Sequence, residues 1–103
     1  MIVNNHIFVD VDGTLLIDSL PNTDLIEWIK EHKKKGFDFT LWSARGADHA
    51  LNVAQCIGVD KLFDRIISKP AIVIDDNGWR WTRYSKMITD KRGLLPIELH
   101  GTI

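Results

Sequence analysis

Apolar residues occur along this chain in short runs that alternate with longer amphipathic stretches. The run from Ile7 to Val11 is interrupted only by Asp10 and ends at Asp12-Gly13, a pattern typical of a buried parallel strand. Further runs of this kind predict strands at Phe37–Trp42, Arg65–Ser68 and Ala71–Ile74. Beyond Gly78, alternating side chains from Trp79 to Tyr84 permit a short edge strand.

Two amphipathic stretches predict helices between these strands. The first runs from Thr23 to Lys35, with Asn22 or Thr23 as its N-cap and Gly36 as its stop. The second runs from Ala47 to Ile57 and precedes Gly58. Strand–helix–strand–helix order predicts the α/β class, as one Rossmann-like domain over residues 1–103 in three layers: a central parallel sheet with helices on both faces.

Composition narrows the range of functions without naming one. A formal net charge of −1 gives no reason to expect nucleic acid or an anionic membrane as an obligatory partner. No apolar stretch resembles a signal peptide or approaches the length of a membrane span. The single cysteine, Cys56, is expected to be a small core residue and fits a reducing compartment, so the cytoplasm is the expected location.

Acidic residues follow the first and the last of the predicted parallel strands. Asp10 and Asp12 are two apart and would share a face, while Asp75 and Asp76 end the fourth predicted strand. Because ligands of such sheets bind at the carboxyl ends of the strands, all four carboxylates should meet there. They would repel one another without a cation. Oxygen ligands of this kind suit Mg²⁺, which the pattern therefore predicts.

This arrangement suits phosphoryl transfer. A carboxylate such as Asp10 can attack phosphorus and form an aspartyl-phosphate that water then hydrolyses. Asp12 has the spacing to protonate the leaving oxygen and then to activate water. Ser43, at the end of the second strand, offers a hydroxyl to a phosphate oxygen, and Lys69 offers an ammonium. Either could instead be an ordinary turn or surface-loop residue.

Together, these residues resemble the haloacid dehalogenase-like superfamily of phosphohydrolases. The four motifs are Phe8-Val9-Asp10-Val11-Asp12-Gly13-Thr14-Leu15, Leu41-Trp42-Ser43-Ala44-Arg45, Lys69, and Ile72-Val73-Ile74-Asp75-Asp76. The resemblance, which covers Ile7 to about Asn77, implies a Mg²⁺-dependent phosphoric monoester hydrolase.

The resemblance also implies a role for each motif residue. Asp10 would be nucleophile and metal ligand, and Asp12 acid/base and a ligand through its backbone carbonyl. Of the last pair, Asp76 is the preferred metal ligand with Asp75 in support, and the opposite assignment stays open. Substrate phosphate would be bound by the segment Ser43-Ala44-Arg45 and by Lys69, although Arg45 could equally form a surface salt bridge to a helix. The response-regulator receiver, a competing phosphoryl-accepting fold, fits less well because its phosphorylated aspartate ends a later strand.

The short spacing between the motifs leaves no room for a cap domain. An uncapped site would be open, which suits a phosphorylated saccharide, a polynucleotide end, a phosphoprotein or small esters handled with low selectivity. Residues Leu16 to Leu20 could form a short flap that carries Asp18.

Three alternatives concern partners. The chain could be a catalytically idle metal-binding module that acts through a protein partner at Trp79–Tyr84. That segment could also be a stacking platform for bases or sugars, although packing in the core or at a sheet edge is the commoner use of aromatic residues. The tail from Asp90 to Ile103 either packs back on the sheet or joins a neighbouring subunit, which leaves a homo-oligomer open.

Overall fold

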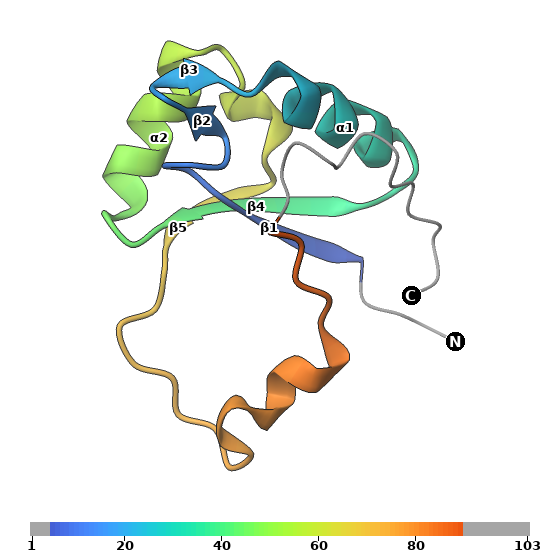
Figure 1. Cartoon of the computed structure of the whole chain (residues 1–103), viewed down its shortest axis with the longest axis vertical. Coiled ribbons are helices and arrows are strands. Elements are labelled where there is room, and N and C mark those ends of the chain that lie inside the picture. Colours follow the sequence, from blue (N-terminus) through green and yellow to red (C-terminus); the bar gives the residue numbers. More distant parts are fainter. Residues whose placement is uncertain (1–4, 90–103) are drawn as a thin grey trace.

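A parallel sheet forms the centre of the computed structural model, which describes residues 5–89 (Figure 1). Its strands are β1 (His6–Asp10), β4 (Asp38–Ser43) and β5 (Arg65–Ser68), in the order β1-β4-β5. Both pairings are parallel, with Asp10 opposite Trp42 and Ser43 opposite Ser68. The carboxyl ends of all three strands therefore meet at one edge. The predicted α/β class is confirmed, as are the first three strands to within a residue or two.

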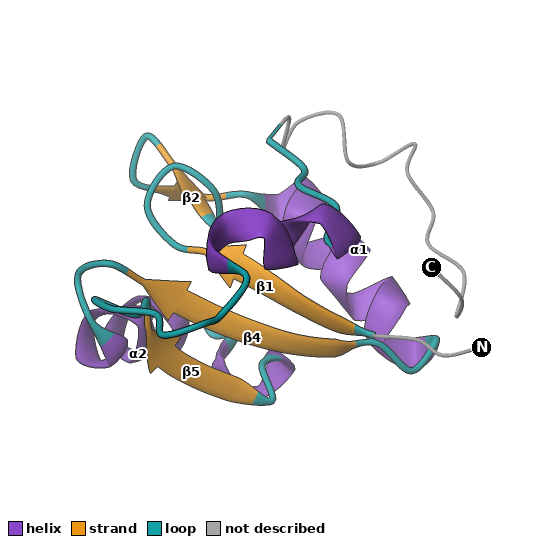
Figure 2. Cartoon of the chain, turned by 90° about the horizontal axis from the view of Figure 1, so that it is seen from below, coloured by secondary structure: helices purple, strands orange, loops and turns teal. Residues whose placement is uncertain are grey.

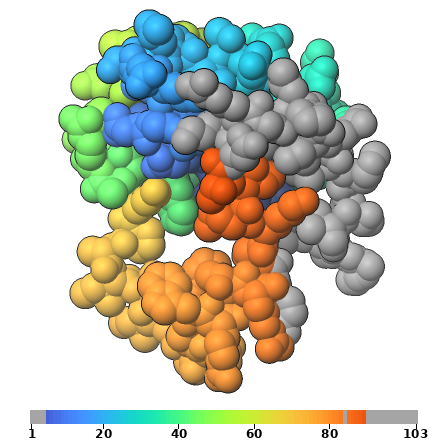
Figure 3. All heavy atoms as spheres, viewed as in Figure 1, coloured from blue at the N-terminus to red at the C-terminus, as the bar shows by residue number. Residues whose placement is uncertain are grey.

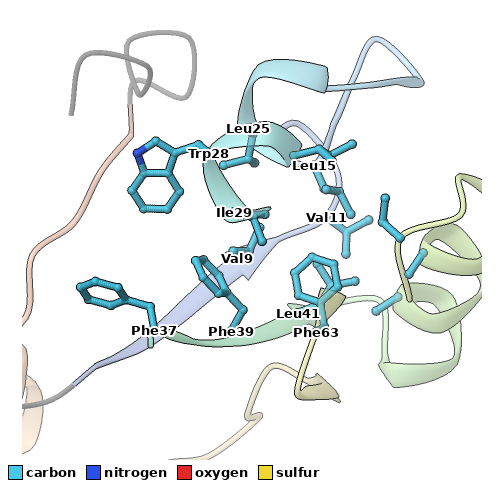
Figure 4. Packing of buried hydrophobic residues seen from close by; sticks show 14 residues of the cluster. Val9, Val11, Leu15, Leu25, Trp28, Ile29, Phe37, Phe39, Leu41 and Phe63 are labelled. Atoms are coloured by element: carbon cyan, nitrogen blue, oxygen red, sulfur yellow. The ribbon is translucent and has the colours of Figure 1, made fainter. Parts of the chain in front are cut away.

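Two α-helices connect these strands, α1 (Thr23–Lys34) and α2 (Ala47–Cys56). The Asn22 side chain caps α1 by accepting a hydrogen bond of 3.3 Å from the backbone N–H of Leu25. Both helices lie against the same face of the sheet (Figures 1 and 4). The expectation of helices on both faces is therefore corrected for residues 5–89, because no α-helix of that range covers the second face. The helix nearest the viewer in Figure 2, which is seen from below, is the 3₁₀ helix η2 (Gly78–Tyr84).

The hydrophobic core fills the space between the helices and the sheet (Figure 4). Alternate residues of the strands, including Val9, Phe39 and Leu41, point into it, and Phe39 and Leu41 are fully buried. From the helices come Leu25 and Ile29 of α1 with Ala50 and Ala54 of α2. These contacts fix where the first turn of α2 lies relative to the end of β1.

A small hairpin follows β1. It pairs β2 (Leu16–Ile17) with β3 (Leu20–Pro21), and its two turn residues, Asp18 and Ser19, have positive φ angles of 52° and 65°. Positive φ at both central positions is the geometry of a tight type I′ hairpin turn. The predicted flap is thus an ordered two-stranded hairpin with Asp18 at its tip.

The predicted strand at Ala71–Ile74 is wrong. These residues form no strand, and Ile72 and Ile74 are 80% and 97% exposed. The connection explains the difference, because only Lys69 and Pro70 lie between β5 and Ala71. A parallel strand needs a crossover of about a dozen residues to return to the start of the sheet. The apolar pattern of residues 71–74 carries no information about the length of the connection before it.

The predicted edge strand at 79–84 is also wrong. The segment forms a 3₁₀ helix, η2 (Gly78–Tyr84), in which the hydroxyl of Thr82 donates a hydrogen bond to the carbonyl of Trp79. Among residues 5–89, no strand pairs with it to supply hydrogen-bond partners. Figure 3 shows this segment, in orange, as a lobe that stands away from the main body of the molecule.

Cys56 is exposed at the end of α2 and is not the core residue expected from the sequence. The residues Asp90–Ile103 lie outside the part of the chain that the structure describes, so the two readings of that tail stay predictions. None of the helices within residues 5–89 is long and apolar enough to cross a membrane.

Candidate active site

The first motif residue, Asp10, ends β1 at the carboxyl edge of the sheet. The chain then turns tightly, with the N–H of Thr14 donating to the carbonyl of Val11 and that of Leu15 to the carbonyl of Asp10. Gly13 has a φ of 85° in this turn, a conformation that L side chains rarely adopt. The turn thus presents the side chains of Asp10, Asp12 and Thr14 at the strand end.

The Asp10 carboxylate is held from two sides. Lys69 Nζ lies 3.0 Å from Oδ1, and the Thr14 hydroxyl donates a hydrogen bond of 3.2 Å to Oδ2. About a third of each partner in the Lys69–Asp10 pair is exposed. One carboxylate with an ammonium beside it, open to solvent, can receive an anionic phosphoryl group.

Lys69 reaches this position because its backbone is fixed. Its N–H donates to the carbonyl of Ser43 at 2.9 Å, which extends the pairing of β4 and β5 by one residue. The ammonium also lies 5.8 Å from the centroid of the Trp42 ring, within the range of a cation–π interaction. The structure therefore brings the predicted Lys69 to the predicted Asp10.

Ser43 lies at the same edge but is buried. Its hydroxyl oxygen accepts a hydrogen bond of 3.0 Å from the N–H of Arg45, and its carbonyl accepts one from the N–H of Gly46. These bonds make Ser43 an organiser of the turn into α2, one of the two uses expected from the sequence. Within residues 5–89, this hydroxyl donates no hydrogen bond of its own.

Asp12 points to a different set of partners. Arg45 Nη1 lies 3.5 Å from its Oδ1, and His49 Nε2 lies 3.0 Å from its Oδ2. Arg45 thus forms a salt bridge, but to Asp12, the acid/base candidate in the turn after β1, and not to a helix as expected. Arg45 is two-thirds exposed, so it is also accessible to a second anionic group.

Asp75 and Asp76 are not brought to this edge. The Asp75 carboxylate accepts a hydrogen bond from the N–H of Asn77, which closes a local turn in the loop before η2. Within residues 5–89, no group of three or more His, Cys, Asp and Glu side chains could hold a metal ion. The expected cluster of four carboxylates is therefore not assembled, because the strand that should have carried two of them does not form.

The residues at the edge nevertheless fit Mg²⁺. This ion is often bound through one or two carboxylates, with substrate phosphate and water as its other ligands. Asp10 and Asp12 are hard oxygen donors on one tight turn, and both are accessible to solvent. When bound, the ion would reduce the repulsion between the phosphate and Asp10.

Two contributors to the site were not foreseen from the sequence. The sequence places Thr14 in the first motif but assigns it no role. It lies four residues after Asp10 across a tight turn, and this spacing could have indicated the hydrogen bond between their side chains. His49 had no local signal, because it sits in the first turn of an ordinary amphipathic helix. Only the packing of α2 against the sheet brings it to Asp12.

A recess of about 440 Å³ elsewhere on the molecule does not belong to this site. It lies between α1 and the segment that follows α2, and its lining includes Ile26, Lys30, Gly58 and Leu62. None of the motif residues contributes to it. The cluster around Asp10 is instead an open rim, at which the side chains of Asp10 and Asp12 are 35% and 47% exposed.

Comparison with known proteins agrees with the motifs and the fold. Searches of curated proteins and of solved structures returned no match for the chain. A family model described as haloacid dehalogenase-like hydrolase matches residues 7–94, most of the sequence and all of the motif residues. The chain therefore belongs to the family of haloacid dehalogenase-like hydrolases.

Proposed function

We propose that this hydrolase is a Mg²⁺-dependent phosphatase that cleaves phosphate monoesters through an aspartyl-phosphate on Asp10. The observation that carries the proposal is the contact of Asp10 with Lys69 and Thr14 at the carboxyl edge of the sheet. A carboxylate with one cationic and one hydroxyl neighbour is held in place as a nucleophile, and the same neighbours can bind the oxygens of the transferring group.

The reaction has two steps. In the first, an Asp10 oxygen forms a bond to phosphorus while the bond from phosphorus to the ester oxygen breaks, and the carboxyl proton of Asp12 passes to the leaving oxygen. In the second, Asp12 takes a proton from water. The resulting oxygen attacks phosphorus and releases inorganic phosphate, which regenerates the Asp10 carboxylate. Lys69 and the Ser43 hydroxyl stabilise the charge on the phosphoryl oxygens in both steps.

Asp10 and Asp12 would hold the Mg²⁺, Asp10 through its carboxylate and Asp12 through its backbone carbonyl. We further propose Asp76 as a third ligand with Asp75 in support, which requires the loop after Lys69 to fold back. Asp76 follows Lys69 by only seven residues, and Lys69 already touches Asp10. A segment that short can span at most roughly 25 Å, which limits the distance between the Asp76 and Lys69 backbones.

The open rim suits substrates in which the phosphate stands at the end of a larger molecule. A phosphorylated saccharide, a nucleotide or a polynucleotide end could present its phosphate to Asp10 without being enclosed. Arg45 is exposed beside Asp12 and would bind a second anionic group of such a substrate.

The test is release of phosphate from an aryl phosphate by the purified chain, with and without Mg²⁺. Asp10→Asn keeps the shape of the side chain and removes the nucleophile, so turnover should fall by at least about 10³-fold. Asp18→Asn at the hairpin tip is the matched control and should retain full activity. Equal turnover by wild type and Asp10→Asn would refute the proposal.

A second candidate function is an idle metal-binding module that acts through a protein partner. It is favoured by the two tryptophans of η2, Trp79 and Trp81, whose rings lie 6.3 Å apart and which are 73% and 39% exposed. They are not the core or sheet-edge packing expected from the sequence. A wild type that binds Mg²⁺ but turns over no phosphate ester would favour this module over the phosphatase.

A further inference from the structure

We infer that His49 is a positioning residue for Asp12, and that it sets the direction in which this carboxyl delivers its proton. The inference deepens the proposed phosphatase function and rests on it. His49 Nε2 lies 3.0 Å from Asp12 Oδ2, within hydrogen-bond distance, although the two residues come from different elements. Asp12 lies in the turn after β1, and His49 lies in the first turn of α2.

Asp12 needs such a partner because it lies in the turn after β1 with its side chain partly exposed. Its side chain is 47% exposed, and a free carboxyl there would rotate into solvent. Proton transfer to a leaving oxygen demands a fixed donor within hydrogen-bond reach, so a rotating carboxyl would be in position only part of the time.

His49 is better suited to this task than Arg45, the other partner. The His49 side chain is only 21% exposed, whereas that of Arg45 is 67% exposed and lies 3.5 Å from the carboxyl. A long exposed side chain loses conformational entropy when it is fixed, so its ion pair contributes little. A short, mostly covered imidazole is already ordered and holds its partner more rigidly.

The backbone around His49 is fixed on the side of the sheet. The N–H of Ala47, the first residue of α2, donates to the Ser68 hydroxyl at 2.8 Å, and Ala50 and Ala54 are fully buried beneath the helix. These contacts connect the first turn of α2 to the end of β5 and to the core. Because the backbone of His49 is fixed in this way, its hydrogen bond restricts the position of the Asp12 carboxyl relative to the sheet.

The bond count of the side chain offers a set of matched variants. Glutamine places its amide nitrogen as many bonds from Cα as histidine places Nε2, and asparagine falls one bond short. We expect His49→Gln to retain most of the wild-type kcat. His49→Asn and His49→Leu should lower kcat about 10- to 100-fold with little change in KM, because Ser43 and Lys69 still bind the phosphate.

The decisive measurement compares two leaving groups. A nitrophenolate leaves without a proton, whereas the alkoxide of an alkyl phosphate needs one from Asp12. In single-turnover experiments, His49→Leu should slow cleavage of the alkyl ester at least about 10-fold more than cleavage of the nitrophenyl ester. A variant that was merely misfolded would slow both equally, and thermal unfolding of each variant checks this independently.

The outcomes separate this inference from the proposal on which it depends. If wild type turns over neither ester, the phosphatase function fails. If wild type is active and His49→Leu matches it on both esters, or slows both to the same degree, the positioning role of His49 is overturned. Rescue by glutamine together with selective loss on the alkyl ester establishes it.

Discussion

Lys69 Nζ lies 3.0 Å from Asp10 Oδ1, although Asp10 ends β1 and Lys69 follows β5, two strands on opposite sides of β4. The lysine spans the end of the middle strand and passes 5.8 Å from the Trp42 ring centroid. A fixed backbone, through the bond from Lys69 N–H to the Ser43 carbonyl, makes this reach possible. The Lys69–Asp10 ion pair thus connects the nucleophile candidate at the end of β1 to the residue that follows β5.

Removing the ammonium should therefore affect catalysis far more than stability. We expect Lys69→Met to lower kcat/KM by about 10²- to 10³-fold, because the charge on the transferring phosphoryl group loses its nearest cation. Since the pair is partly exposed, the free energy of unfolding should change by less than about 1 kcal/mol. Steady-state kinetics and urea unfolding measure the two effects. Lys69→Arg keeps the charge and should recover part of the activity; a stability loss as large as the kinetic loss would contradict this division.

Removal of the metal tests which carboxylates hold it. Chelation with EDTA should abolish turnover, and Mg²⁺ should restore it. If Asp76 reaches the ion, Asp76→Asn should raise the Mg²⁺ concentration for half-maximal activity at least about 10-fold and reduce the rise in Tm that Mg²⁺ produces. Asp75→Asn should have a smaller effect. An Asp76→Asn variant with wild-type values in both measurements would leave Asp10 and Asp12 as the ligands.

The environment of Asp64, which lies outside the active site, predicts that the stability of the fold depends on pH. Its carboxylate accepts a hydrogen bond of 2.8 Å from the N–H of Phe39 and pairs with Lys33 at 3.3 Å. The bond from Phe39, with Lys33 in support, holds the pKa of Asp64 below its ordinary value of 3.8. A lowered native pKa favours the folded state above that value, and the benefit is lost as the pH falls through the native pKa.

We therefore expect Asp64→Ala to lower the free energy of unfolding by about 1 kcal/mol at neutral pH. The side chain is 39% exposed, so solvent screening keeps the ionic part of this small. The difference from wild type should shrink as the pH drops below about 4. Urea unfolding across this range gives the measurement. Asp64→Asn still accepts the hydrogen bond from the Phe39 N–H, so its free energy of unfolding should lie between those of wild type and Asp64→Ala. A difference between wild type and Asp64→Ala that does not change with pH would contradict the lowered pKa of Asp64.

The core offers a prediction for the sheet itself. Phe39 is fully buried in the middle strand, with its ring in edge contact with Trp28 of α1 at 6.1 Å between centroids. Phe39→Ala should cost about 3–5 kcal/mol of unfolding free energy, and Phe39→Leu much less. Chemical denaturation monitored by circular dichroism measures both. The exposed Leu20→Ala should change stability by under about 0.5 kcal/mol.

By itself, the sequence determined the local elements and the motif chemistry. Apolar spacing and capping residues are local properties, so β1, α1 and β5 could be placed from the pattern, and the residues Asp10, Ser43 and Lys69 could be assigned to strand ends. Parallel strands align their carboxyl ends, which is why Lys69 could be expected near Asp10 before any contact was known.

Only the tertiary structure decided where the remaining groups lie. His49 meets Asp12 because the buried alanines of α2 set the rotation of that helix on the sheet, and no local pattern encodes that rotation. The apolar run Ala71–Ile74 looks like a strand, yet the two residues before it are too few for a crossover. The local hydrophobic pattern indicates which side chains of a segment could be buried. Whether the segment packs against the sheet depends on the length of its connection and on the neighbouring elements.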